Sequence, residues 1–216
     1  KNEEWEMLKN YYRGMFFFHS CVIQQFPPLY IELDKIFRQT DAEFIDVLNN
    51  LRHNKITSVD VQLLNQFVQP DFDLKKNKGF IILTTHNSKA DTINAKSLED
   101  LEGKQFTYLP EITADFPEKI YPLEEKLQLK VGAQVMFIKN DLNFEKQFFN
   151  GKMGVISSLT EKEIFVHFPE ENKTIEVERY EWQNIRYKVN ENTKEIEEEV
   201  IGTFVHYPIK LAWAIT

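Results

Sequence analysis

The sequence contains a single cysteine, Cys21, among 216 residues. One cysteine cannot form an intrachain disulfide, which suits a reducing compartment, so we expect a cytoplasmic protein. The five histidines are scattered, and with one cysteine they do not make a zinc-ligand pattern, so no metal site is predicted. Cys21 lies in a stretch that contains Phe and Val, which favours a small buried hydrophobe over a nucleophile.

The chain also has few glycines and no phosphate-binding loop. Such a loop needs Gly, four residues, and then Gly-Lys-Ser/Thr. The Gly-Lys pairs, Gly103-Lys104 and Gly151-Lys152, are followed by Gln105 and Met153, and neither has a glycine five positions earlier. The residues therefore provide no nucleotide cradle, which argues against an independent enzyme.

Long apolar runs and excess positive charge are absent too. No run approaches the ~20 residues of a membrane helix, so we expect no membrane partner. Lys+Arg number 26 against 34 Asp+Glu, a net charge of −8. Residues 170–199 hold ten Glu against five Lys/Arg, a net of −5, so a polyanion should avoid this segment.

The first half of the chain reads as an α/β layer. Residues 29–36 alternate in polarity and predict a strand. Helices should follow, one capped by Thr40 or Asp41 and one opened by Thr57. A strand at 80–84 and a helix at 87–98 complete the order strand, helix, helix, strand, helix, which favours an α/β fold.

Short strand-like runs dominate after about residue 104. They lie at 104–109, 131–139, 153–159, 163–168, 173–177, 183–189 and 196–205. Several short strands separated by turn signals predict a small barrel or sandwich. We expect residues 121–205 to form an antiparallel unit whose interior holds Val135, Phe137, Val155, Ile164 and Val166. The apolar stretch 208–216 predicts a further strand, and its abrupt end suggests a piece cut within a fold.

Three stretches resemble a known family. Ile31-Glu-Leu-Asp-Lys-Ile-Phe-Arg-Gln39 resembles the Phe-Arg-Gln motif of superfamily 1 DNA helicases. Val131-Gly-Ala-Gln-Val-Met136 and Leu211-Ala-Trp-Ala-Ile-Thr216 are similar to two further landmarks of that family. The match is best with the petite-integration-frequency (Pif) branch, relatives of RecD, and it covers essentially the whole chain.

The resemblance implies a domain plan for an internal fragment of a helicase. Residues 1–28 would be the tail of a first RecA-like domain, and 29–120 the first part of a second one with a parallel sheet. Residues 121–205 would be an inserted Src-homology-3-like antiparallel β-barrel, and 206–216 the return strand. The Walker motifs would lie upstream, so the parent would use ATP and Mg²⁺ in DNA repair or recombination. This fragment alone would be inactive and would bind neither ATP nor Mg²⁺.

The resemblance also implies roles in ATP hydrolysis. Arg38 matches the arginine that reaches the γ-phosphate from the second RecA-like domain, and Gln39 would orient it. A guanidinium is permanently charged and can donate two hydrogen bonds at once to phosphate oxygens. The alternative for Arg38 is a surface arginine at the end of a strand.

A second group of residues is expected to bind single-stranded DNA. Thr85, His86 and Asn87 lie between the predicted strand and helix, where hydroxyl, amide and backbone N–H donors suit phosphates. They resemble the family's DNA-contacting segment, and Lys89 would add charge. Helix capping by Thr85 or Asn87 is a compatible alternative, and Asn94 is expected to be structural. Lys152 could meet DNA or a protein, or be a solvated turn lysine.

The predicted partners are therefore single-stranded DNA and, in cis, the first RecA-like domain. The rival hypothesis is a non-catalytic module whose β-barrel recruits a protein partner, for which the acidic segment is suited. The two roles could coexist in one parent.

Overall fold

The computed structural model describes residues 5–6, 8–33, 35–37, 39–73, 76–141, 146–189 and 195–216. The contacts divide the chain into two units, Lys1–Pro70 and Asp71–Thr216, and each is described by itself. Within the described ranges, no helix has the length and apolar character needed to cross a lipid bilayer.

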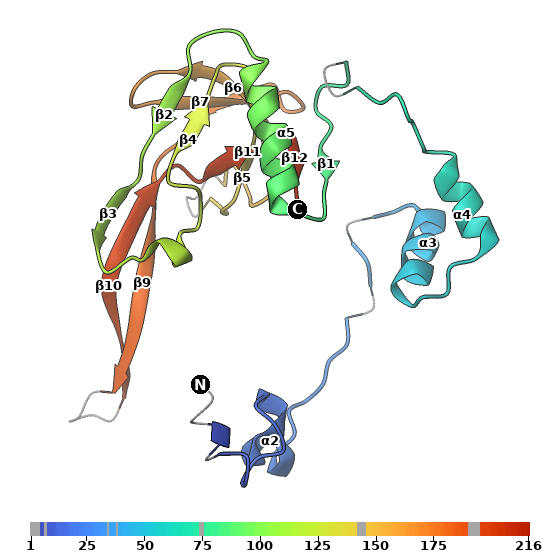
Figure 1. Ribbon diagram of the computed structural model, residues 1–216, viewed down its shortest axis with the longest axis vertical. Coiled ribbons are helices and arrows are strands. Elements are labelled where there is room, and N and C mark those ends of the chain that lie inside the picture. Colours follow the sequence, from blue (N-terminus) through green and yellow to red (C-terminus); the bar gives the residue numbers. More distant parts are fainter. Residues whose placement is uncertain are drawn as a thin grey trace. The chain divides into compact units, whose positions relative to one another are not determined.

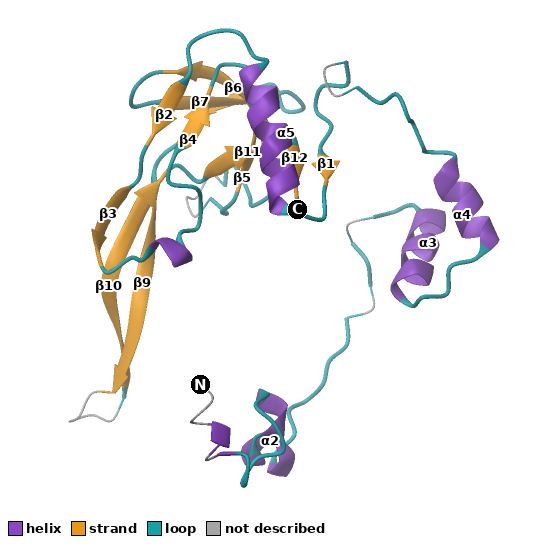
Figure 2. Cartoon of the chain, viewed as in Figure 1, coloured by secondary structure: helices purple, strands orange, loops and turns teal. Residues whose placement is uncertain are grey.

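The regular structure of the first unit is helical (Figures 1 and 2). Its elements are η1 (Phe17–His19), α2 (Cys21–Gln25), α3 (Ala42–Arg52) and α4 (Ser58–Asn65). The Asp41 side chain caps α3, and Thr57 forms a capping box with Asp60 at the start of α4. Both helix starts confirm the expectation from the sequence, because these side chains accept the N–H groups that a first turn leaves unpaired.

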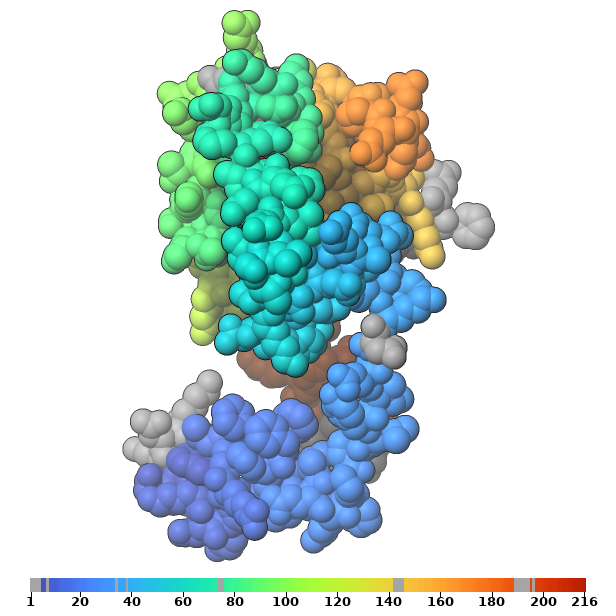
Figure 3. Space-filling model, turned by 90° about the vertical axis from the view of Figure 1, so that its right-hand side faces the viewer, coloured from blue at the N-terminus to red at the C-terminus, as the bar shows by residue number. Residues whose placement is uncertain are grey.

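The first unit buries little of its apolar surface. Val47 of α3 is 2% exposed, whereas Val59, Phe67 and Val68 are 69%, 73% and 61% exposed. Figure 3 shows one side of the surface of this part of the chain, coloured cyan. Cys21 is also exposed, so the prediction of a buried cysteine is wrong.

The predicted strand at 29–36 is wrong as well. The described residues of this range have no regular secondary structure. Leu29, Ile31 and Leu33 are 86%, 71% and 91% exposed. A strand persists when a neighbour pairs its backbone groups, and no described residue of this unit does so. The alternating pattern marks a segment that fits a sheet, but pattern alone does not supply the partner.

The second unit contains the α/β element of the fold. Strands β1 (Ile82–Leu83) and β12 (Ala214–Ile215) pair in parallel, with Ile82 opposite Ala214. Helix α5 (Asn87–Glu99) lies beside β12 (Figure 1). The expected strand and helix are thus confirmed in position, although the strand is shorter than predicted.

A larger antiparallel sheet follows, in the order β11-β5-β6-β7-β8. Its strands are β5 (Gln134–Phe137), β6 (Met153–Leu159), β7 (Ile164–Phe168), β8 (Lys173–Glu176) and β11 (Ile209–Leu211). A separate antiparallel pair consists of β2 (Phe106–Tyr108) and β4 (Leu127–Leu129). The described pairings do not close this sheet into a barrel, so the chain is a mixed α/β protein with small sheets.

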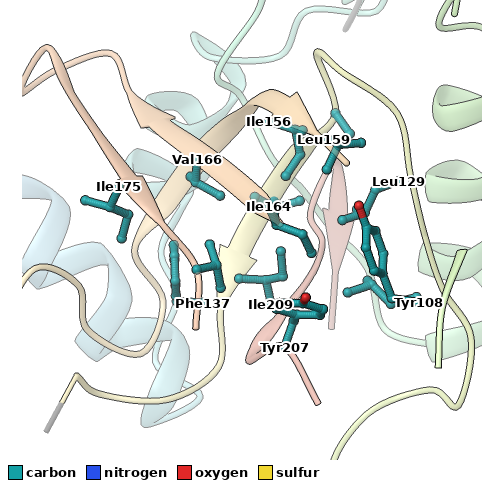
Figure 4. Close-up of a cluster of buried hydrophobic side chains, with 14 of the residues drawn as sticks. Tyr108, Leu129, Phe137, Ile156, Leu159, Ile164, Val166, Ile175, Tyr207 and Ile209 are labelled. Atoms are coloured by element: carbon teal, nitrogen blue, oxygen red, sulfur yellow. The ribbon is translucent and has the colours of Figure 1, made fainter. Parts of the chain in front are cut away.

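The core of the second unit joins these two sheets (Figure 4). Val135, Phe137, Ile164 and Val166 are fully buried, as predicted. Val155 is instead half-buried, because strand alternation turns Gly154 and Ile156 toward the core. Pairing reaches outside residues 121–205, since β11 pairs with β5 and contributes the buried Ile209.

The third sheet forms an arm in the order β3-β10-β9. Its strands are β3 (Glu111–Ala114), β9 (Tyr180–Val189) and β10 (Ile196–His206), and a short helix, η2 (Glu118–Ile120), follows β3. The strands β9 and β10 extend away from the five-stranded sheet (Figure 2). Both were expected from the sequence, whereas β3 and β4 were missed.

Candidate nucleic-acid interface

The junction between β1 and α5 contains the four residues predicted to contact DNA, which are Thr85, His86, Asn87 and Lys89. Thr84 ends β1's pairing by donating its N–H to the carbonyl of Ile215 at 2.8 Å. Its hydroxyl donates to the His86 carbonyl at 3.0 Å, which fixes the turn into the helix. His86 is the N-cap of α5 and makes no side-chain cap bond. The N-cap side chain therefore accepts none of the N–H groups that the first turn of α5 leaves unpaired.

The side chains of this junction are exposed. The Thr85 hydroxyl and His86 Nδ1 are hydrogen-bonded at 2.8 Å. The Asn87 carbonyl oxygen accepts from the Thr216 hydroxyl at 2.6 Å, so the amide NH₂ is its donor toward solvent. Lys89 is exposed in the first turn of the helix. Neither Thr85 nor Asn87 caps α5, so the capping alternative is not what the structure shows.

Asn94 holds this junction to the neighbouring strand. Its amide donates to the Ala214 carbonyl at 2.9 Å, and its carbonyl oxygen accepts from the Ala214 N–H at 2.8 Å. The side chain is buried, so the two bonds replace hydration that it has lost. The expectation of a structural role for Asn94 is confirmed.

Gln134 ties the junction to the five-stranded sheet. Its amide Nε2 lies 2.9 Å from both the Phe80 and the Ala212 carbonyl oxygens, two residues before β1 and β12 respectively. The Ala212 N–H donates back to the Gln134 carbonyl at 2.9 Å. One buried amide on β5 thus anchors the starts of both parallel strands.

A cavity of about 630 Å³ borders the junction between α5, residues 118–128 and the last two strands. Asn87 and Thr216 lie at its edge. Its ionisable lining comprises four carboxylates, two lysines and one histidine: Asp91, Glu118, Glu124, Glu125, Lys126, Lys210 and His206. This charge balance is unfavourable for binding a phosphate backbone inside the cavity.

His206 contributes to this cavity wall from the core. It is fully buried, and neither ring nitrogen has a hydrogen-bond partner among the described residues. Burial, and secondarily the Arg179 charge, lowers the pKa of His206 to about 4. A neutral imidazole is therefore the form that the fold accommodates.

The predicted ATP-site residues belong to the first unit. Arg38 lies outside the described residues. Gln39 is half-buried, and its side-chain oxygen accepts from the N–H groups of Thr40 and Asp41 at 2.8 and 3.1 Å. These bonds shape the entry to α3, and the role of Gln39 in orienting Arg38 stays a prediction.

Lys152 lies apart from the β1–α5 junction, next to β6. Its ammonium group donates to the Gln147 carbonyl at 2.8 Å, pairs with Glu171 at 2.7 Å, and lies 3.9 Å from the Phe168 ring centroid. The side chain is only 11% exposed. These contacts favour a structural role over the solvated turn lysine or DNA contact that the sequence left open.

The supporting residues of the junction had weak signals in the sequence. Gln134 stands in an apolar run, where a polar residue should have a buried partner. Thr216 gave no signal, because its contact with Asn87 joins positions far apart in the chain. The described residues contain no group of three or more His, Cys, Asp or Glu side chains that could hold a metal ion.

The chain is similar in sequence to ATP-dependent DNA helicases and in fold to solved helicase structures, although no family model matches it. More narrowly, these relatives include Pif1 helicases and the helicase RRM3 of Saccharomyces cerevisiae. Pif1 of Bdellovibrio bacteriovorus is 26% identical over 184 residues, which are 83% of this chain and 38% of that protein. The crystal structure of Bacteroides Pif1 in complex with ADP-AlF4 covers the whole chain at 38% identity and a TM-score of 0.78.

A second Bacteroides Pif1 structure, bound to single-stranded DNA, matches with 38% identity and a TM-score of 0.61. The chain spans about half of each Bacteroides Pif1 chain, 49% in both structures. The resemblance to the Pif branch of superfamily 1 helicases is thus confirmed.

Proposed function

We propose that this chain supplies the second motor domain of an ATP-dependent DNA helicase of the Pif type. Its first contribution is part of the single-stranded DNA track, formed by Thr85, His86, Asn87 and Lys89. The observation that carries this proposal is the β1–α5 junction, where an uncapped helix start coincides with exposed hydroxyl and amide groups. Such donors suit phosphate oxygens and read no base sequence.

Its second contribution is half of an ATP site. Arg38 would reach the γ-phosphate of ATP·Mg²⁺ held by a P-loop domain in the same protein. A permanently charged, bidentate donor stabilises the charge of phosphoryl transfer without a proton transfer. The similarity to Bacteroides Pif1 structures over the whole chain supports the proposal that this chain and a P-loop domain each supply half of the ATP site.

We also propose that the five-stranded sheet and the β2–β4 pair form the body of an Src-homology-3-like insertion in the motor domain. The shared core of these sheets supports one compact body. The buried Gln134 bonds would couple its position to the β1–α5 junction.

The DNA-binding proposal is tested with the chain itself and a fluorescently labelled oligothymidylate. Few cations take part, so we expect weak binding near ~10⁻⁴ M and a shallow salt dependence, with about one or two phosphates neutralised. Asn87→Ala and Lys89→Ala should each weaken binding severalfold, as measured by fluorescence anisotropy.

The matched control for Lys89 is Lys96→Ala, two turns further along the same helix. It removes an equal charge from a site outside the junction. An equal loss with Lys96→Ala, or no loss with Asn87→Ala, would contradict the assigned track.

A further inference from the structure

Helix α5 binds the last strand and the residue after it through two asparagines of one helix face. Asn87 and Asn94 are seven residues apart, which is nearly two full turns, so their side chains lie on the same side of the helix. Asn94 exchanges two hydrogen bonds with Ala214 of β12, and Asn87 accepts from the hydroxyl of Thr216. Thr216 therefore lies beside the first turn of α5, where the proposed DNA track begins (Figure 1).

The position of Thr216 is set by the contacts of the two residues before it. The buried Asn94 side chain fixes Ala214. The N–H of Thr84 donates to the Ile215 carbonyl at 2.8 Å. The Thr216 hydroxyl is thus carried by a strand end that is hydrogen-bonded on one side to α5 and on the other to the segment that leaves β1.

The Asn87 carboxamide can present either of two chemically opposite groups to the solvent. Rotation by half a turn about its last bond exchanges the carbonyl oxygen with NH₂ and hardly changes the shape of the side chain. An outward NH₂ can donate to a phosphate oxygen, whereas an outward carbonyl oxygen would face the phosphate with a lone pair. Asn87 is exposed, so packing does not select between the two orientations.

The hydrogen bond with Thr216 selects one of these orientations. The hydroxyl oxygen of Thr216 lies 2.6 Å from Asn87 Oδ1. This separation fits an O–H···O bond, usually about 2.7–2.8 Å long, better than an N–H···O bond of about 2.9–3.0 Å. The hydroxyl is therefore the donor, and the NH₂ of Asn87 points away from it. Among the described residues, no other hydrogen bond holds the Asn87 side chain.

We propose that Thr216 is a positioning residue of the single-stranded DNA track. Its hydroxyl holds the Asn87 carboxamide in the orientation that offers NH₂ to a phosphate oxygen, and Thr216 itself does not contact the DNA. The ligand is the phosphodiester backbone, since the group on offer is a donor that reads no base. This role of Thr216 rests on the proposed function of Asn87 in DNA binding.

The first measurement follows the Asn87 side chain without DNA, by ¹⁵N relaxation of the whole chain. The order parameter of the Asn87 Nδ2–H bonds should fall below about 0.6 in Thr216→Val, because valine keeps the β-branched shape but lacks the hydroxyl. Thr216→Ser keeps the hydroxyl and should retain the wild-type value. The Asn94 amide is the internal control and should stay ordered in both variants, since it binds Ala214.

The second measurement is a double-mutant cycle in the binding of labelled oligothymidylate, followed by fluorescence anisotropy. Thr216→Val and Asn87→Ala should each weaken binding by about threefold, in line with the loss of one neutral hydrogen bond. In the Asn87→Ala background, Thr216→Val should cause no further loss, because the group that it orients is absent. Thr216→Ser should bind like the wild type.

Three results would overturn the proposal, each in a different way. An Asn87 order parameter that is unchanged in Thr216→Val would show that the hydroxyl does not orient the amide. A further loss of binding in the double variant would show that Thr216 contacts DNA directly. Undiminished DNA binding by Asn87→Ala, with the order parameter still lowered by Thr216→Val, would place the failure in the proposed DNA track rather than in the hydrogen bond.

Discussion

At the scale of single residues, His206 combines full burial with two unpartnered ring nitrogens. Its pKa is lowered to about 4, against an ordinary value of 6.5. Between pH 4 and pH 6.5, the His206 side chain therefore binds a proton in the unfolded chain but stays neutral in the folded chain. The contribution to stability is complete above pH 6.5 and is lost as the pH falls toward 4.

We predict that His206→Leu flattens this part of the pH dependence. The unfolding free energy of the wild type should fall by about 2 kcal/mol more than that of the variant between pH 7 and 4.5. Urea unfolding followed by tryptophan fluorescence measures the difference. His167→Gln is the control, because His167 is only partly buried and is hydrogen-bonded to Thr174. A wild-type slope retained in His206→Leu would contradict the assignment.

The residue scale also shows what sequence can say about the site. Thr85, His86, Asn87 and Lys89 were predicted as DNA contacts from a local pattern and a family resemblance, and the predicted strand–helix junction is the part that the structure contains. Their supports were harder to predict, since Gln134 and Thr216 act through contacts that depend on the tertiary fold. For Lys152, the sequence predicted the neighbouring turn. It did not predict the contacts of the lysine with Glu171 and Phe168.

At the scale of elements, Gln134 links β5 to the starts of β1 and β12. We predict that Gln134→Met, which conserves volume, leaves the Phe80 and Ala212 carbonyls without that donor and costs about 1–3 kcal/mol. Amide hydrogen exchange should accelerate at Ile82, Thr84 and Ala214, whose bonds hold the parallel pair and α5 together.

The control for this prediction is Gln128→Met, at an exposed position of β4. It introduces the same side chain without removing a buried amide. If both variants exchange at the wild-type rate in β1 and β12, Gln134 does not anchor these strands.

Elements with strong periodicity were predictable, and the exceptions have physical causes. Helix α5 buries every fourth residue from Ala90 to Leu98, and β7 buries every second residue, so their sequence pattern indicated their structure. The range 29–36 has an equally clear pattern but lacks a described strand partner. Strand β3 was missed because its four residues are all exposed and show no alternation in burial.

At the scale of the whole molecule, the absence of a phosphate-binding loop sets the first expectation. We predict that this chain alone neither binds Mg-ATP at micromolar concentrations nor hydrolyses it, because it has no cradle for the β- and γ-phosphates. Isothermal calorimetry and phosphate release measure the two properties. Micromolar binding would contradict the interpretation of the chain as half of an ATP site.

The central claim is that Arg38 completes an ATP site formed with a P-loop domain of the same protein. Its most direct test is the single-stranded-DNA-stimulated ATPase rate of a protein that contains both parts, compared between wild type and Arg38→Ala. We predict a fall of about 10³-fold or more, with DNA binding retained, whereas Arg13→Ala should keep the wild-type rate. Arg38→Lys should remain impaired, because an ammonium lacks the guanidinium fork. An undiminished DNA-stimulated ATPase rate in Arg38→Ala would contradict the account.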